Sequence, residues 1–365
     1  MSVQVSYKKQ FVFGILLILV ILVSIEGFSR IFLAYSLECD FMKADTYSDL
    51  DDQYKKQMCA DHYNKIMYMI PYRHHEPNQH FSTLNINSEG FRGSEISLIK
   101  PDNTYRIFMV GGSTTFSSGS SSDYTTITGY LQQNFDQSEI NKKIEVINAG
   151  HDGMFSWDET ESIKNKIVNY DPDLIIIYNG ANDLQYSYNY IEKFMSNKSD
   201  FDKVEDKARG MTSFYKTLIV GNLFSKSIQK SINESKGTKP LDTENISERI
   251  SLWKNKQIEN CKIGNEQGFD TLIILQPIID IDKKPLTDFE EKVFKSVEDW
   301  PNSYQLFANE FEKLNSFCEN TIDLRNVFEG IEEPLFYDWA HLGDKGNKII
   351  ADRIFEKILP PIQSS

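Results

Sequence analysis

Residues Tyr105–Phe116 have the sequence YRIFMVGGSTTF, and the organisation of the chain follows from this segment. Arg106–Val110 is a short, largely apolar run that ends in two glycines, a serine and two threonines. A buried strand that enters a glycine-rich turn is typical of the first strand of an α/β sheet. The glycines allow the backbone to turn sharply, so we expect Ser113 at the carboxyl end of this strand, as a potential nucleophile.

Two known motifs do not fit this turn. A phosphate-binding P-loop requires a lysine after its glycines, and none follows here. The nucleophile elbow of α/β-hydrolases requires G-x-S-x-G, but position 115 is Thr115. Taken alone, the segment also fits an ordinary strand and turn with a capping serine, so the function depends on the rest of the sequence.

Composition excludes some classes of partner. The 365 residues are 40% hydrophobic and 25% charged, which is typical of a globular protein. The net charge of −14 argues against a nucleic-acid partner, because no basic surplus exists to neutralise phosphates. The four cysteines and six histidines show no zinc-binding spacing. We therefore expect no metal site and no nucleic-acid partner.

The N-terminal region is strongly apolar. Two lysines precede the run Phe11–Ile25, and apolar character continues to Tyr35 apart from Glu26 and Arg30. The uninterrupted run is shorter than the roughly 20 residues of a membrane span, but the extended one is long enough. Lysines on the amino side favour a cytoplasmic N-terminus and an exported body. We expect residues 1–35 to be a single-pass membrane anchor.

Two alternatives to the anchor remain open. A cleaved signal peptide is one, because Ala34–Ser36 has the small-x-small form of a cleavage site. A buried helix of a soluble protein is the other.

Export also changes how the cysteines are interpreted. Disulfides persist outside the cytoplasm, and four cysteines allow three pairings. Proximity in sequence favours Cys39–Cys59, with Cys261–Cys318 as the second pair. Free buried thiols are the alternative.

The remaining chain divides into three parts. Residues 36–80 are polar and acidic, and we expect a juxtamembrane spacer that can pack on the main domain. Within it, the adjacent His74 and His75 are expected at the surface. Residues 81–365 form the main domain, with a polar, mostly helical insert at 185–249 that is either a lid or a surface decoration.

From Tyr105 onward the pattern alternates between strand and helix. Later apolar runs predict strands at Ile144–Asn148, Asp173–Tyr178, Thr271–Leu275 and Asn320–Leu324. This alternation predicts right-handed βαβ units and a parallel sheet covered by helices on both faces.

Chemically capable residues follow these strands. Ser113 follows the first strand, Gly150 the second and Asn182 the third, and Asp338 and His341 come before the final helix. Ligands of open α/β sheets bind outside the carboxyl ends of the strands. We therefore expect all five residues at one edge of the sheet.

Their chemistry suits acyl transfer. Ser113 would attack a carbonyl, His341 would take its proton, and Asp338 would orient and stabilise the imidazolium. The backbone N–H groups of Ser113 and Gly150 and the side-chain amide of Asn182 would form the oxyanion hole.

Residues 105–350 resemble the SGNH hydrolase superfamily, also called GDSL-type esterases. Ser113 in GGSTT corresponds to the family's GDSL serine, and Gly150 to its glycine. The family's G-x-N-D block resembles Gly180–Asp183, and its D-x-x-H block resembles Asp338–His341. The resemblance implies a flavodoxin-like, three-layer α/β/α fold, with a five-stranded parallel sheet of order 2-1-3-4-5 and no cofactor.

The expected function is that of an extracytoplasmic, membrane-anchored serine esterase. It would hydrolyse a small acyl ester, expected to be acetyl, on a carbohydrate or lipid through an acyl-serine intermediate. One alternative is an O-acyltransferase that acts on cell-surface glycans. Another is a glycan-binding protein that keeps the fold without catalysis. The expected partners are the acylated substrate and the membrane, and the sequence indicates no oligomeric state.

Overall fold

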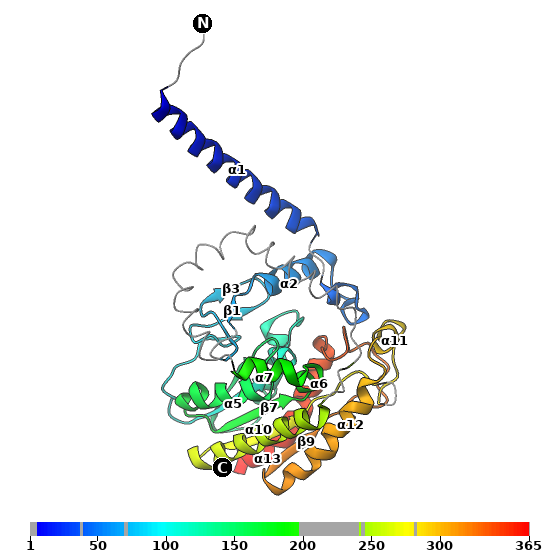
Figure 1. Cartoon of the computed structure of the whole chain (residues 1–365). Helices are drawn as coiled ribbons and strands as arrows, with labels where there is room; N and C mark the ends of the chain where they lie inside the picture. The colour runs from blue at the N-terminus through cyan, green and yellow to red at the C-terminus, as the bar shows by residue number, and fades with distance from the viewer. Residues whose placement is uncertain are drawn as a thin grey trace. The chain divides into compact units, whose positions relative to one another are not determined.

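The computed structural model describes residues 6–36, 39–68, 72–196, 241, 245–280 and 283–364 (Figure 1). Contacts divide the chain into two units. One comprises Met1–Glu38 and Asp200–Gly237, and the other comprises Cys39–Ser199 and Thr238–Ser365.

The second unit is built on a five-stranded parallel sheet. Its strands are β5 (Thr104–Gly111), β6 (Lys143–Gly150), β7 (Leu174–Asn179), β8 (Asp270–Leu275) and β9 (Asn320–Asp323). The spatial order is β6-β5-β7-β8-β9, so the expected order 2-1-3-4-5 is confirmed. Every residue of β7 is buried, as expected for a central parallel strand with helices on both faces.

Helices cover both faces of the sheet. On one face, α4 (Ile127–Asp136) packs against β6 and against α13 (Asp344–Ser364). On the other, α10 (Ile246–Gln267) packs between α5 (Ser156–Asn165) and α12 (Trp300–Phe311), as Figure 1 shows. The three-layer α/β/α architecture is therefore confirmed.

Shorter elements connect this framework. The other helices among the described residues of the second unit are α2 (Asp52–Asn64), α3 (Ser113–Phe116), α6 (Ala181–Gln185), α7 (Tyr188–Ser196) and α11 (Asp288–Phe294). The 3-10 helices are η1 (Asp40–Lys43), η2 (Asp45–Tyr47), η3 (Asp123–Thr125), η4 (Ile167–Tyr170) and η5 (Glu312–Ser316). Two antiparallel ribbons pair β1 (Met67–Tyr68) with β2 (His74–His75), and β3 (Gln79–His80) with β4 (Asn85–Ile86).

Both expected disulfides are present. Cys39 is bonded to Cys59 and Cys261 to Cys318. The first bond ties the start of the second unit to α2 across 20 residues of sequence. The second joins α10 to the segment directly before β9.

The segment expected as a spacer belongs to the same unit as the sheet. The Tyr47 hydroxyl donates to the Gly119 carbonyl at 2.6 Å, and the Tyr54 hydroxyl donates to the Ser121 carbonyl at 2.8 Å. These bonds fasten the segment beside the loop that follows α3. Of the expected insert at 185–249, most lies outside the described residues.

The first unit contains one described helix, α1 (Tyr7–Ser36). Its segment Tyr7–Phe28 has 22 residues and a mean hydropathy of 2.7. At 1.5 Å per residue this segment is about 33 Å long, close to the roughly 30 Å hydrocarbon core of a bilayer. Its length and composition suit a membrane anchor, and they suit a signal sequence equally.

Candidate active site

Ser113 stands at the carboxyl end of β5, as the sequence predicts. It is the first residue of α3, and Gly111 and Gly112 lead the chain into this helix. Both glycines are required by close packing. A Cβ at Gly111 would collide with the Tyr178 carbonyl, and one at Gly112 would collide with the Asn182 amide. The turn is therefore packed tightly against β7 and the segment after it.

His341 and Asp338 meet Ser113 in an arrangement typical of a serine hydrolase. The His341 Nε2 atom lies 2.6 Å from Ser113 Oγ, and His341 Nδ1 lies 2.7 Å from Asp338 Oδ2. The other carboxylate oxygen, Asp338 Oδ1, accepts hydrogen bonds from the amides of Ala340 and His341. The carboxylate therefore fixes both the loop and the imidazole ring that the loop carries.

The environment keeps Asp338 ionised. Burial acts to raise its pKa, but the charge of the His341 ring and the hydrogen bonds from this ring and from two amides outweigh burial. The pKa of Asp338 is lowered as a result. An ionised carboxylate at Nδ1 selects the tautomer in which Nε2 can accept the proton of Ser113. The ring of Tyr337 stacks on His341 with a centroid separation of 5.3 Å and further restricts its rotation.

Asn182 lies beside Ser113, as the sequence predicts. It belongs to α6, directly after β7, and its Nδ2 atom donates to the Met154 carbonyl at 2.7 Å. The same nitrogen is the atom that a Cβ at Gly112 would meet. Because the amide has two N–H groups, one can hold Met154 while the other remains for a ligand at Ser113.

The expected role of Gly150 does not agree with the structure. Its amide donates to Asn148 Oδ1 at 3.0 Å, so this N–H is engaged within the protein rather than free for an oxyanion. A Cβ at Gly150 would collide with the backbone nitrogen of Phe116, not with a bound substrate. Glycine is needed here because β6 and α3 pack too closely for a side chain.

Gly153 is a donor candidate that the sequence analysis missed. It has φ of +73° and belongs to a turn in which the Met154 amide donates to the His151 carbonyl at 3.1 Å. Met154 is the residue held by Asn182. In the described part of the chain, the Gly153 amide has no hydrogen-bond acceptor. The second glycine of the GHDG segment was the only sequence signal for it.

A cavity of about 300 Å³ opens at the triad. Ser113, Asp338 and His341 line it together with Asp152 and the loop after α3. The opposite wall is formed by four residues of the N-terminal segment: Cys39, Phe41, His62 and Tyr63. Because these residues precede Ser113 by at least 50 positions, no local spacing could have associated them with the site.

A buried ion pair fastens that wall to the site. Lys65 Nζ lies 2.6 Å from Asp152 Oδ2, and both side chains are largely buried. The other oxygen of Asp152 accepts from Ser118 Oγ at 2.6 Å. Lys65 also lies over the Phe116 ring, 5.3 Å from its centroid. The N-terminal segment, α3 and the turn that contains Gly153 therefore share one network of contacts.

His75 does not lie at the surface, where the sequence predicts it. His75 is buried, and its ring lies 4.2 Å from that of His151, centroid to centroid. Burial lowers the pKa of His75 well below its ordinary value. Adjacent residues on a strand point to opposite faces, so His75 faces inward while His74 is only partly buried.

Asp183 has a structural contact. Its carboxylate accepts from the Ser156 hydroxyl at 2.5 Å, which joins α6 to the start of α5. Burial raises the pKa of Asp183 to about 7. This contact holds the loop that carries Asn182 against the start of α5.

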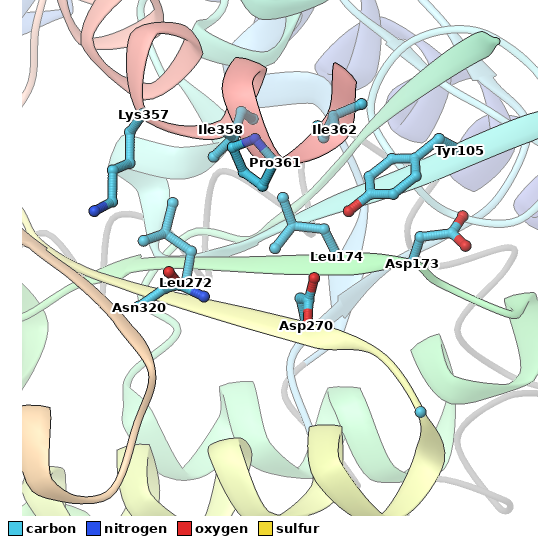
Figure 2. A pocket seen from close by; sticks show the side chains of 11 residues that line it. Tyr105, Asp173, Leu174, Asp270, Leu272, Asn320, Lys357, Ile358, Pro361 and Ile362 are labelled. Carbon is cyan, nitrogen blue, oxygen red and sulfur yellow. The ribbon is translucent and has the colours of Figure 1, made fainter. Parts of the chain in front are cut away.

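A second cavity of about 280 Å³ lies at the other edge of the sheet (Figure 2). Figure 2 shows Tyr105, Asp173 and Asp270 around it, at the amino ends of β5, β7 and β8, with Lys357 from α13. Ligands of open α/β sheets bind at the carboxyl ends, so this cavity is not the candidate active site. Within the described ranges, no group of three or more histidine, cysteine, aspartate or glutamate residues could hold a metal ion.

Three comparisons with known proteins gave matches only among solved structures. No family model and no curated protein matches the chain. Among solved structures, the acetyl xylan esterase AlAXEase is 14% identical, with a TM-score of 0.42, over 69% of this chain and 99% of its own. Axe2, an acetylxylan esterase from Geobacillus stearothermophilus, is 12% identical, with a TM-score of 0.42, over 70% of this chain and 94% of its own.

A third similar structure, from Desulfitobacterium hafniense DCB-2, is assigned to the G-D-S-L lipolytic family. It is 12% identical, with a TM-score of 0.38, over 69% of this chain and 98% of its own. These values are too low to transfer a substrate. The chain's own geometry is a five-stranded parallel sheet with a contacting serine, histidine and aspartate at the carboxyl end of its strands.

Proposed function

We propose that this chain is a membrane-anchored, extracytoplasmic serine esterase that removes a small acyl group, preferentially acetyl, from a carbohydrate or lipid. The observation that carries the proposal is the 2.6 Å contact between His341 Nε2 and Ser113 Oγ, with Asp338 on the other ring nitrogen. A glycan-binding protein would not need these three groups in hydrogen-bond contact.

In the proposed reaction, Ser113 Oγ attacks the ester carbonyl as His341 takes its proton. The Ser113–acyl bond forms, and the protonated imidazole returns its proton to the departing alcohol. Water then attacks the acyl-serine while His341 takes its proton. The bond between Ser113 Oγ and the acyl group breaks, the acid is released, and His341 returns the proton to Ser113 Oγ. Asp338 stabilises the imidazolium in both steps.

The developing oxyanion requires preorganised donors. We infer that these are the Ser113 amide, the second N–H of Asn182 and the Gly153 amide. Gly150 is not included, because its amide is bonded to Asn148.

A fluorophosphonate probe tests the nucleophile. The full-length chain in detergent should be labelled at Ser113, because only a hydroxyl paired with a base reacts readily with such a probe. Mass spectrometry of the labelled peptide gives the site. Ser113→Ala should abolish labelling, and Ser97→Ala, at an exposed serine outside the cavity, should not. Labelling that persists in Ser113→Ala, or unlabelled protein that still releases acetate, would contradict the assignment.

A further inference from the structure

We propose that His62, together with Phe41 and Tyr63, forms the binding subsite for the alcohol part of the ester, and that this alcohol is a carbohydrate hydroxyl. The inference rests on the proposed esterase function. It assigns a substrate-binding role to the N-terminal segment Cys39–Lys65, which lies outside the part of the chain that resembles SGNH hydrolases.

The first step is position. His62 and Tyr63 are on α2, and they line the same cavity as Ser113 and His341. His62 and His341 therefore face the same cavity. The general acid must reach the oxygen of the leaving alcohol, so groups beside His341 face the alcohol rather than the acyl group.

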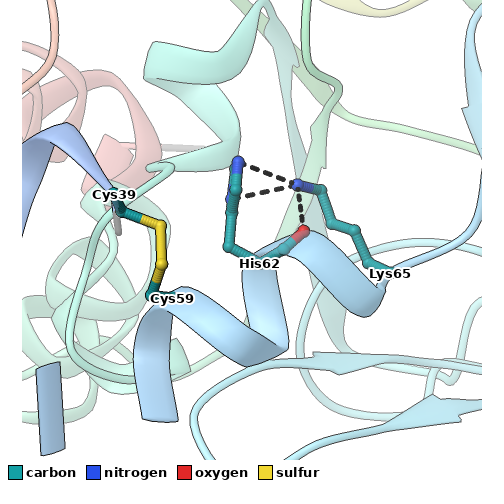
Figure 3. Close-up of a disulfide and its surroundings, with 4 residues drawn as sticks. All are labelled: Cys39, Cys59, His62 and Lys65. Carbon is teal, nitrogen blue, oxygen red and sulfur yellow. Dashed lines mark hydrogen bonds between the residues drawn. A yellow bond between two sulfur atoms is a disulfide. The ribbon is translucent and has the colours of Figure 1, made fainter. Parts of the chain in front are cut away.

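The second step is the chemistry of His62. Figure 3 shows the Lys65 ammonium beside this ring, 3.0 Å from Nδ1 and 3.4 Å from Nε2. Burial and the Lys65 charge lower the pKa of His62 to about 3, so the ring is neutral at physiological pH. An ammonium can only donate, so the closer nitrogen, Nδ1, accepts and Nε2 carries the proton. With this assignment, His62 is the lining residue whose ring N–H we assign to a ligand in the cavity.

The third step is rigidity. Cys59, on α2, is bonded to Cys39, which is itself part of the cavity wall (Figure 3). Lys65 is held by Asp152, so the ammonium that sets the state of His62 cannot move away freely. Such a braced wall retains its shape before a ligand arrives, which lowers the entropic cost of binding.

The fourth step is the occupant. Phe41 packs against Tyr337 with ring centroids 5.9 Å apart, and the Tyr63 ring lies 6.0 Å from His62 at 80°. The wall therefore combines aromatic rings, which contact the C–H face of a sugar, with an N–H donor that requires an acceptor oxygen. A simple alkyl alcohol would leave the His62 donor without a partner, and a lost partner weakens binding. A sugar hydroxyl or ring oxygen supplies the acceptor.

The test compares two acetyl esters on the full-length chain in detergent. Glucose pentaacetate has a carbohydrate alcohol, and 4-nitrophenyl acetate has a flat aryl alcohol without ring oxygens. We expect His62→Phe to lower kcat/KM for glucose pentaacetate about tenfold, the effect of one lost hydrogen bond. The same variant should change kcat/KM for 4-nitrophenyl acetate less than about twofold, because the triad is untouched.

Two further variants make the result specific. His62→Gln keeps an N–H donor and should recover most of the activity on glucose pentaacetate. His80→Phe replaces an exposed histidine outside the cavity and should leave both activities unchanged. The inference would be overturned if His62→Phe left the ratio of kcat/KM for the two esters unchanged. It would also be overturned if the wild-type enzyme hydrolysed 4-nitrophenyl acetate but not glucose pentaacetate. Wild-type protein inactive on both esters and unlabelled at Ser113 would instead overturn the proposed function.

Discussion

At the scale of single residues, Asn182 has two tasks that one amide can perform together. One N–H holds the Met154 carbonyl at 2.7 Å, and the other is available beside the start of α3. The first contact is structural, because it fixes the turn that contains Gly153. The second would matter only when negative charge develops on the substrate, so the two tasks are separable by experiment.

Asn182→Ala should lower kcat by about 10²–10³ with little change in KM, because an oxyanion donor acts mainly in the transition state. Steady-state rates on 4-nitrophenyl acetate and thermal melting should be measured on the same preparation. Asn165→Ala, at an exposed helical position, is the control and should affect neither. A lowered Tm with normal kcat would show that Asn182 only supports the turn.

At the scale of elements, the contact between β6 and α3 controls where the nucleophile stands. Gly150 ends β6, and the backbone of Phe116 in α3 occupies the place where its Cβ would be. Since α3 begins at Ser113, any shift of this short helix moves the nucleophile. Proximity effects in catalysis are steep, so a displacement of about 1 Å is enough to lower the rate strongly.

Gly150→Ala should therefore destabilise the fold and lower kcat together. Overpacking of this kind typically costs about 1–3 kcal/mol of unfolding free energy, which thermal melting detects. Gly27→Ala adds the same methyl group where nothing lies within 4 Å, and it should leave Tm and kcat unchanged. A methyl that crowded the substrate instead of α3 would raise KM and leave Tm unchanged, and that result would contradict the packing explanation.

At the scale of the whole molecule, only two residues separate the end of α1 from Cys39, the first residue of the hydrolase unit. Lys8 and Lys9 precede the apolar run, which favours a cytoplasmic N-terminus.

We expect the full-length chain to stay in the membrane pellet after carbonate washing, with its C-terminus accessible from outside. Two charges in the span, Leu17→Arg with Leu19→Arg, should release it, since each costs roughly 2.5–3.5 kcal/mol at the centre of a span. Immunoblotting of pellet and supernatant gives the distribution. N-terminal sequencing that begins at Leu37 would show a cleaved signal peptide and reject the anchor.

The sequence alone determined the framework of this protein. The strands were predictable because strands buried on both faces, such as β7, appear as uninterrupted apolar runs between helices, while their spatial order followed from the family resemblance. Asp338 and His341 were predictable because they lie three positions apart in one loop and the fold delivers that loop to Ser113. Both signals are local: each depends on neighbours in the chain or on the alternation of elements.

Only the tertiary structure decided the contacts between distant segments. Which atoms Gly150 faces depends on how closely α3 packs on β6, and the one-letter sequence contains no measure of that distance. Likewise, His62 and Phe41 reach the cavity because Tyr47, Lys65 and a disulfide bind their segment to the loops around Ser113. Side chains that are far apart in the sequence meet because their segments pack together and because buried ion pairs join them. Such packing has no periodicity, so sequence pattern could not reveal the second wall of the site.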